Sequence, residues 1–154
     1  MNGYGSYTTA NPCFTPLSKG GDGYSTYPGL YINTGVPKNG EGIRVFTQNE
    51  KDRSETYYSF GYDKNDDQLG DWLHMAIVVD GKDKTMYLDG VEVARDEQNL
   101  DVNFTYANSQ DMFIGIMGAA SPEWYPFNGK IDDIRIYNMA LTPSEINVLF
   151  KGDR

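Results

Sequence analysis

The sequence predicts an all-β fold, a sandwich or a barrel, with one short helix near its C-terminus. Three observations lead to this prediction. Short runs with β character recur along the chain, turn signals rich in Gly and Asp separate them, and one helix-capping pattern occurs at residues 142–145. The 154 residues match the usual size of one domain that buries a real core, so we expect a single domain over residues 1–154.

The strands are expected where β-branched and aromatic residues gather. Aromatic residues make up 14% of the chain and favour strands, while 17 Gly residues supply the positive φ angles of tight turns. Asp89-Gly90 lies directly between two short runs and predicts a hairpin with a primed turn. Residues 2–29 are expected to form loops with one or two strands. The expected strands are residues 30–32, 43–46, 56–62, 73–80, 85–88, 91–94, 112–117 and 131–137.

The helix is predicted to begin after Thr142, which supplies an N-cap hydroxyl. Pro143 follows at the first helical position and Glu145 at the third, which completes a capping box. We expect one or two helical turns that run to about residue 150, with Ile146, Leu149 and Phe150 on the buried face.

Charge and composition exclude several classes of partner. The net charge of −9 disfavours nucleic acids and anionic membranes, which need clustered Lys and Arg, and leaves neutral ligands or cations. No run approaches the ~20 apolar residues of a membrane span, so no membrane insertion is expected. Cys13 is the single cysteine, hence no intrachain disulfide can form. No signal peptide is visible after Met1.

Two segments carry a resemblance to a known family. Residues 127–138 (FNGKIDDIRIYN) and 140–146 (ALTPSEI) closely resemble the C-terminal signature of laminin-G-like, concanavalin A-like domains. Residues 71–80 (DWLHMAIVVD) and 86–91 (MYLDGV) are similar to the family's Trp-His strand and the Asp-Gly hairpin after it. Residues 16–22 (PLSKGGD) look like its early Lys-containing loop. The chain differs from the family pattern in one respect: the segment before Phe14 is too short to contain the family's long apolar strand.

The resemblance implies a concanavalin A-like jelly-roll β-sandwich of two antiparallel sheets. It also implies a structural role for His74, which has no Ser or Cys nucleophile motif nearby, and a core position for Trp72. Retaining glucanases of the superfamily carry alternating acidic residues on one strand. We expect no such run in this chain, and therefore no enzymatic activity.

Calcium is the expected cofactor if a metal is bound. Alternation along residues 131–137 places Asp132 on the side of Ile134 and Ile136, where a carboxylate must be paired, hydrogen-bonded or bound to a metal. Loops at one sandwich edge in this superfamily often bind Ca²⁺, which takes six to eight oxygen ligands. Asp22, in a Gly-rich loop, and Asp132 are therefore the metal candidates. The alternative is that Asp132 caps backbone N–H groups or pairs with a base.

The ligand-binding candidates are aromatic. Trp124 and Tyr125, with Glu123 beside them, lie in a Pro-bounded loop over residues 121–126, where a ring face can stack on a sugar while polar groups bind its hydroxyls. The alternative is that these aromatics fold over the sandwich rim. Tyr58 shares one strand face with two other aromatic residues, which either line a concave platform or pack across strands.

We therefore expect a non-catalytic, lectin-like module that binds an oligo- or polysaccharide and is part of a larger extracellular or cell-surface protein. A protein-interaction or adhesion domain, with a protein partner, is the alternative. A glycoside hydrolase or lyase is a third interpretation, and it would require two carboxylates that face one groove.

Overall fold

The structure of the chain is a computed structural model, and it describes residues 14–19, 29–34, 43–48, 57–62, 72–81, 83–95, 111–116, 126–127 and 129–152. Within these described residues there are eight strands and one helix. The strands are β1 (Phe14–Lys19), β2 (Gly29–Thr34), β3 (Ile43–Gln48), β4 (Tyr57–Tyr62), β5 (Met75–Asp80), β6 (Asp83–Leu88), β7 (Val91–Arg95) and β8 (Met112–Ile114). The helix is α1 (Pro143–Gly152).

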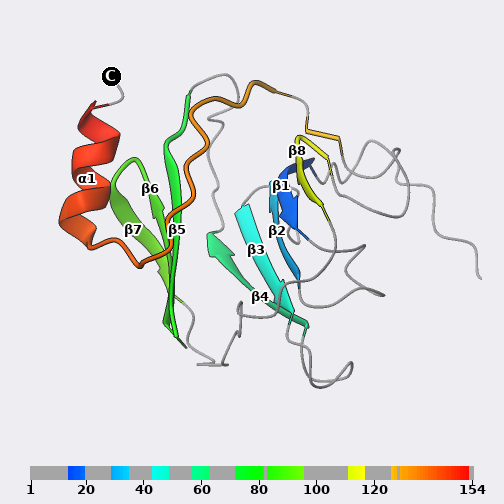
Figure 1. The fold of residues 1–154 in the computed structure, drawn as a ribbon, viewed down its shortest axis with the longest axis horizontal. Helices are drawn as coiled ribbons and strands as arrows, with labels where there is room; N and C mark the ends of the chain where they lie inside the picture. The colour runs from blue at the N-terminus through cyan, green and yellow to red at the C-terminus, as the bar shows by residue number, and fades with distance from the viewer. Residues whose placement is uncertain are drawn as a thin grey trace, which may run out of the picture.

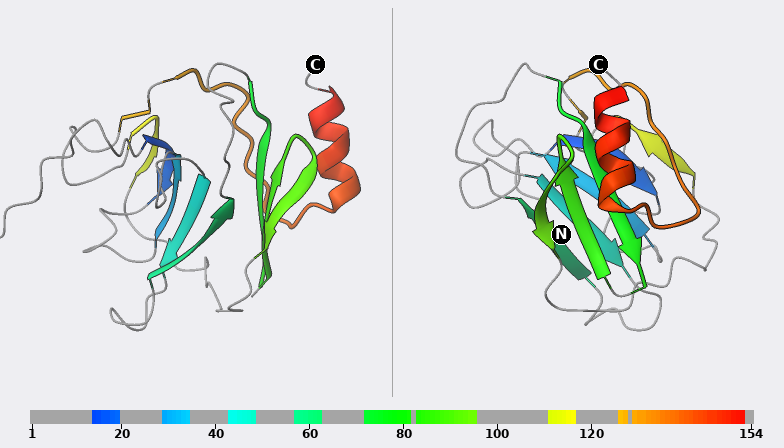
Figure 2. Two further views of the ribbon diagram at one scale, coloured as in Figure 1. Left: turned by 180° about the vertical axis from the view of Figure 1, so that it is seen from behind. Right: turned by 90° about the vertical axis from the view of Figure 1, so that its left-hand side faces the viewer.

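The strands form two antiparallel sheets, as predicted. One sheet has the order β4-β3-β2-β1-β8, and the other has the order β5-β6-β7. The two sheets face each other as separate layers, and α1 covers the outer side of the three-stranded sheet (Figures 1 and 2). The sandwich expected from the sequence is therefore confirmed.

The described core lies between the two sheets. Ile43 and Val45 of β3 meet Met86 and Leu88 of β6, and all four side chains are buried. Partly buried residues surround this cluster: Ile32, Leu73, Met75, Ile77, Val93 and Ala94. Burial of these apolar side chains is the main force that holds the layers together.

Strand β1 lies within residues 2–29, which were expected to form loops with one or two strands. It contains Pro16, which cannot donate a ladder hydrogen bond and is tolerated in sheets mainly at edges and bulges. The register between β1 and β2 shifts between Phe14 and Leu17, so Pro16 lies within this irregularity. β8 is shorter than expected because Gly115, with φ 77°, follows its last residue and leaves the extended conformation.

The hairpin between β6 and β7 is confirmed. Asp89 and Gly90 connect the two strands and both have positive φ angles, 50° and 77°. These are the angles that a type I′ turn requires, which explains the Asp-Gly pair. The Asp89 amide also donates to the His74 carbonyl at 2.8 Å, so the turn is attached to the residue that precedes β5.

The capping box of α1 is also confirmed. The Thr142 amide donates to Glu145 Oε2 at 2.7 Å, and the Glu145 amide donates to Thr142 Oγ1 at 3.3 Å. Ile146 is fully buried, whereas Leu149 and Phe150 are half-buried. The predicted face of the helix therefore packs on the sheet.

The capping box makes a testable contribution to pH dependence. The Thr142 backbone N–H, and secondly its hydroxyl, hold the pKa of Glu145 below its ordinary value. This contribution to stability is present above the unfolded-state pKa and is lost as the pH falls through the lower folded-state pKa. We expect the unfolding free energy of the wild type to fall more than that of Glu145→Gln between about pH 6 and about pH 3, measured by urea denaturation. Equal losses would contradict the role of Glu145.

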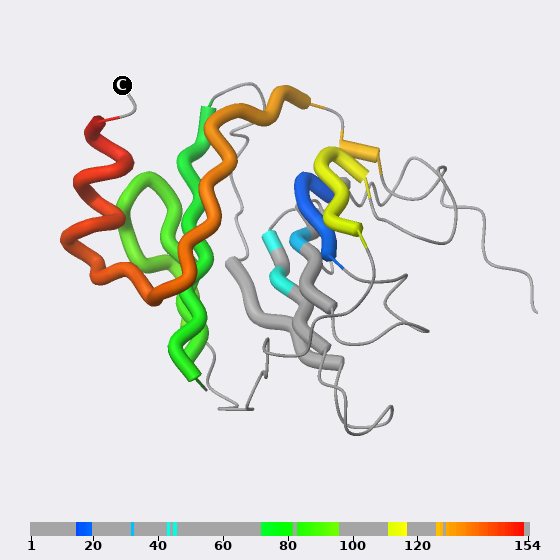
Figure 3. The backbone as a smooth tube through the Cα atoms, in the orientation of Figure 1, coloured from blue at the N-terminus to red at the C-terminus, as the bar shows by residue number. Residues whose placement is uncertain are grey.

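The expected strand over residues 131–137 is wrong in this structure. None of these residues is in a strand, and the segment runs past the β5 side of the three-stranded sheet towards α1 (Figures 1 and 3). Asp133 has a φ of 52°, a left-handed conformation that breaks an extended chain. The alternation assumed for this segment therefore fails at Asp133.

Candidate ligand-binding surfaces

The predicted aromatic loop is attached at both ends to the edge of the five-stranded sheet. Pro126 forms a parallel bridge with Thr15 in β1, and the Phe127 amide donates to the Gly115 carbonyl at 2.8 Å. Before the loop, the Ile116 carbonyl accepts a hydrogen bond from Ser18 Oγ at 3.0 Å. Residues 117–125 connect these two anchors.

The three candidates in this loop, Glu123, Trp124 and Tyr125, lie outside the described residues, and so does Asp22. Trp124 precedes Pro126 by two residues, so the covalent chain holds their Cα atoms within about 8 Å of each other. Pro126, the last residue of this loop, pairs with Thr15 near the start of β1.

Tyr58 belongs to the opposite end of the same sheet. Across the sheet, its backbone pairs with Thr47 in β3, Thr47 pairs with Leu30 in β2, and Leu30 pairs with Lys19 at the end of β1. Thr15 and Pro126 lie towards the other end of β1. The side chain of Tyr58 is outside the described part of the structure. The register thus separates Tyr58 from the Trp124 loop, and the two are not expected to form one site.

Asp132 does not face the apolar interior, so that expectation is wrong. Its side chain is exposed, and its Oδ1 accepts a hydrogen bond from the Asp133 amide at 2.8 Å. The neighbouring Asp133 carboxylate lies 3.4 Å from the Arg135 guanidinium. Within the described ranges, no three His, Cys, Asp or Glu residues are grouped as a metal site. A calcium site at Asp132 would need further ligands from elsewhere, and calcium stays a prediction.

Trp72 is exposed, which contradicts the core position that the resemblance implied. Its exposed fraction is 65%. The next residue, Leu73, packs against the core, and His74 turns to the opposite side, where its ring lies 5.8 Å from that of Phe150 in α1. Alternation from Leu73 and His74 places Trp72 on the outer side of the sheet. Sequence comparison with a family motif could not reveal this exposure.

His74 has the structural setting that was expected. Its carbonyl accepts from the Asp89 amide, and its own amide donates to Asp89 Oδ1 at 3.1 Å. Nδ1 is buried and has no hydrogen-bond partner within the described residues. Its ring packs beneath α1, 5.8 Å from the ring of Phe150.

Glu92 is held in an ion pair on β7. The Arg95 guanidinium donates two hydrogen bonds to it, at 2.9 and 2.8 Å. The hydrogen bond from Arg95 is the largest cause that keeps the pKa of Glu92 below its ordinary value. Burial, followed by the charge of Glu92, raises the pKa of Tyr87. Glu92 is thus an ionised, paired carboxylate.

The expectation that the chain has no acidic run of the kind found in retaining glucanases is wrong, because one run has the spacing Glu-x-Asp-x-x-Glu. Glu50, Asp52 and Glu55 follow it in the sequence. They lie between the end of β3 at Gln48 and the start of β4 at Tyr57, outside the described residues. The structure does not describe the run, and a test of hydrolysis must therefore include it.

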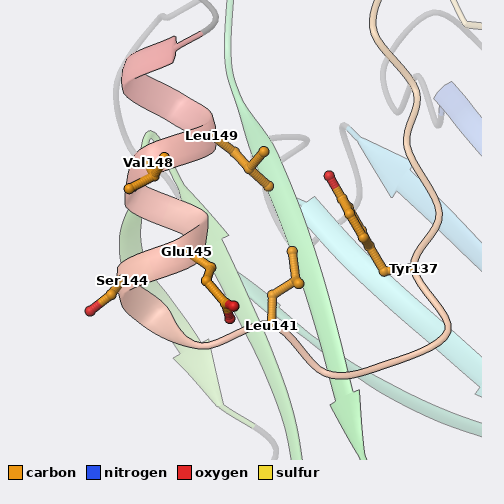
Figure 4. Close-up of a pocket in the computed structure, with 6 residues that line it drawn as sticks. All are labelled: Tyr137, Leu141, Ser144, Glu145, Val148 and Leu149. Atoms are coloured by element: carbon orange, nitrogen blue, oxygen red, sulfur yellow. The ribbon is translucent and has the colours of Figure 1, made fainter.

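An apolar groove that the sequence analysis missed lies beside α1. It has a volume of about 310 Å³, and Leu141 and Leu149 lie between the helix and Tyr137 (Figure 4). Ser144, Glu145 and Val148 complete its lining. The Glu145 carboxylate is already bound by Thr142, so few polar groups remain for a ligand. The spacing of Leu141, Val148 and Leu149 could have indicated it, but the position of Tyr137 depends on the fold.

Comparison with known proteins identifies the family. The model of a laminin G group, described as the concanavalin A-like lectin/glucanases superfamily, matches residues 5–147. The chain belongs to this superfamily. The resemblance carried by the Trp-His, Asp-Gly and C-terminal segments is thereby confirmed. A superfamily that includes both lectins and glucanases leaves the ligand of this laminin G-like domain open.

Two other comparisons add little. No curated protein matches the laminin G-like domain. Among solved structures, it is similar to residues 221–444 of an S-layer domain-containing protein from Clostridium thermocellum, with 20% identity and a TM-score of 0.44, over 97% of this chain and 68% of that one. Within the described residues, no helix is long and apolar enough to cross a membrane.

Proposed function

We propose that this laminin G-like domain is a non-catalytic carbohydrate-binding module, part of a larger extracellular or cell-surface protein. The observation that carries the proposal is that the residues flanking 117–125 are bound at the same edge of the sheet: Ser18 of β1 donates to Ile116, Pro126 pairs with Thr15 of β1, and the Phe127 amide donates to Gly115. Binding sites occur often on loops that a rigid scaffold positions. This loop contains adjacent Trp124 and Tyr125, with Glu123 next to them.

The expected mode of recognition is stacking. A Trp or Tyr ring covers the apolar face of a sugar, while the carboxylate of Glu123 accepts hydrogen bonds from its hydroxyl groups. The net charge of −9 favours neutral over anionic polysaccharides, because like charges repel.

The first experiment is a binding screen by affinity electrophoresis and calorimetry over plant, microbial and animal glycans. We expect saturable binding of a neutral saccharide, and Trp124→Ala should weaken it by about 1 kcal/mol or more without unfolding the domain. Trp124→Phe is the matched control, since it keeps a ring and should lose less. Unchanged affinity in Trp124→Ala would place the site elsewhere, with Tyr58 next in line.

The same samples test the absence of catalysis. Release of reducing sugar from any bound polysaccharide, lost in Glu50→Gln, would show that the domain is a hydrolase. We expect no release.

Calcium is tested by chelation. If Asp22 and Asp132 hold a structural Ca²⁺, removing the ion should lower the melting temperature by several degrees, because ligand binding stabilises the folded state. Asp132→Ala should abolish the difference between samples with Ca²⁺ and with chelator. An identical melting temperature in both samples would remove calcium from the proposal.

A protein-binding role is the second candidate, and the groove beside α1 favours it. Two of the apolar side chains that line it are exposed, Val148 at 69% and Tyr137 at 45%. Clustered exposed apolar side chains often mark interaction surfaces. A glycan screen without binding, together with a protein partner whose affinity falls in Val148→Asp, would support this role over carbohydrate binding.

A further inference from the structure

Trp72 is an exposed aromatic side chain on a rigid part of the domain. With 65% of its surface exposed, it has a face available to a ligand. Exposure of an indole ring to water is unfavourable because most of its surface is apolar, and Trp is highly buried on average. The family resemblance implied a core position, so the exposure of Trp72 calls for a physical explanation.

The backbone around Trp72 is held in place from two sides. Leu73 packs against the core cluster between the sheets. His74 exchanges two hydrogen bonds with Asp89, at 2.8 and 3.1 Å, and packs against Phe150 of α1. Binding groups on such supported elements need little ordering when a ligand binds, which preserves affinity.

Polar groups suited to hydroxyl recognition lie at the same end of the sheet. Trp72 precedes His74 by two residues, about 7 Å along an extended chain. His74 is directly opposite Asp89, whose carboxylate uses one oxygen for the His74 amide and can accept further hydrogen bonds. The β6–β7 turn also meets α1 there, because Asn147 Oδ1 lies 3.3 Å from the position of a Cβ on Gly90. The start of β5 and the C-terminal end of α1 share this end of the molecule (Figure 1).

We propose that Trp72 is a stacking platform for a neutral saccharide, separate from the Trp124 loop, with Asp89 as a hydrogen-bond acceptor beside it. The proposal rests on the carbohydrate-binding function and extends it. An exposed indole two residues from the His74–Asp89 pair suits a sugar ring, which is apolar on its faces and polar at its edge. The net charge of −9 disfavours anionic ligands at this surface.

Two platforms would give the domain two contacts with one polysaccharide. The Trp124 loop is attached to the five-stranded sheet, whereas Trp72 precedes β5 of the three-stranded sheet. A long chain that reaches both platforms would bind more tightly than a short oligosaccharide of the same sugar, because the second contact becomes intramolecular.

The chain contains only two Trp residues, so each can be observed alone. Trp124→Phe leaves Trp72 as the single indole, and Trp72→Phe leaves Trp124. Each variant is titrated with soluble neutral polysaccharides, namely a β-glucan, a xylan and a mannan, and its tryptophan fluorescence is recorded. We expect a saturable change in emission for Trp72 in the first variant and for Trp124 in the second.

The outcomes separate the two proposals. A response from Trp124 alone would overturn the Trp72 platform and leave carbohydrate binding intact. A response from Trp72 alone would support the platform and place the main site there. Absence of binding by both variants and by the wild type in calorimetry would overturn carbohydrate binding and the platform together.

A second measurement distinguishes ligand contact from a structural role. Trp72→Ala should weaken polysaccharide binding about fivefold or more, in line with the worth of one aromatic contact. Its melting temperature should change little, because the side chain is exposed. Val91→Ala is the matched control: Val91 is also 65% exposed, at the start of β7, but has no ring to stack. Equal affinity in Trp72→Ala and wild type would overturn the proposal.

Discussion

Ile146→Ala is expected to lower the free energy of unfolding by about 2–5 kcal/mol, the range for truncation of a fully buried Ile. Ile146 has an exposed fraction of 0% and anchors α1 on the three-stranded sheet. Truncation removes buried apolar surface and leaves a cavity that the surrounding strands fill only in part. Urea denaturation followed by circular dichroism measures the loss.

Val148 provides the control on the same helix. Its exposed fraction is 69%, so Val148→Ala should change the unfolding free energy by no more than about 0.5 kcal/mol. Ile146→Val, which removes a single methylene group, should cost about 0.5–1.5 kcal/mol. Similar losses for Ile146→Ala and Val148→Ala would show that α1 is not docked through Ile146.

Gly90→Ala is expected to cost about 2–5 kcal/mol from two separate causes. Gly90 has a φ of 77°, and a non-Gly residue in the left-handed region costs about 1–2 kcal/mol. A Cβ there would also lie 3.1 Å from Phe150 Cδ1 and 3.3 Å from Asn147 Oδ1. Both side chains must shift by a few tenths of an ångström, which adds a cost of overpacking of about 1–3 kcal/mol. Denaturant titration of both proteins measures the sum.

Gly81→Ala separates the two causes. Gly81 has a φ of 60°, but a Cβ on it would meet no atom within 4 Å. It should therefore lose the backbone contribution alone, about 1–2 kcal/mol. If both substitutions cost the same, α1 does not press against the β6–β7 turn, and the packing described for Phe150 is wrong.

Features that depend on neighbours in the chain were predictable from the sequence. The Asp89-Gly90 turn needs positive φ angles, and few residue pairs other than Asn-Gly and Asp-Gly adopt them at low cost. The Thr142 and Glu145 capping box depends on four consecutive residues. Both were expected, and both are confirmed.

Features that depend on alternation across a whole segment were less predictable. The alternation of residues 131–137 suggested a strand with Asp132 turned inward, whereas the left-handed Asp133 interrupts the extended chain and leaves Asp132 exposed. Trp72 seemed a core residue because of its family motif, but the orientation of the neighbouring Leu73 and His74 turns it outward.

The candidate site stays a prediction from the sequence. Aromatic residues and a carboxylate in a Pro-bounded loop indicated carbohydrate binding, and the family match agrees with the sandwich that carries such loops. The sequence had no means to show that Tyr58 and the Trp124 loop belong to opposite ends of one sheet. That follows from strand register, which joins residues far apart in the chain.

By itself, the sequence determined the fold class, the hairpin, the helix and its cap, and the superfamily, because short-range conformational preferences and local motifs encode each of them. Only the tertiary structure decided which side chains face water: Trp72 outward, Asp132 exposed, and Tyr137 across a groove from α1. The physical reason is that exposure depends on which distant segments pack over a residue, and packing minimises the apolar surface of the whole domain rather than of any one segment.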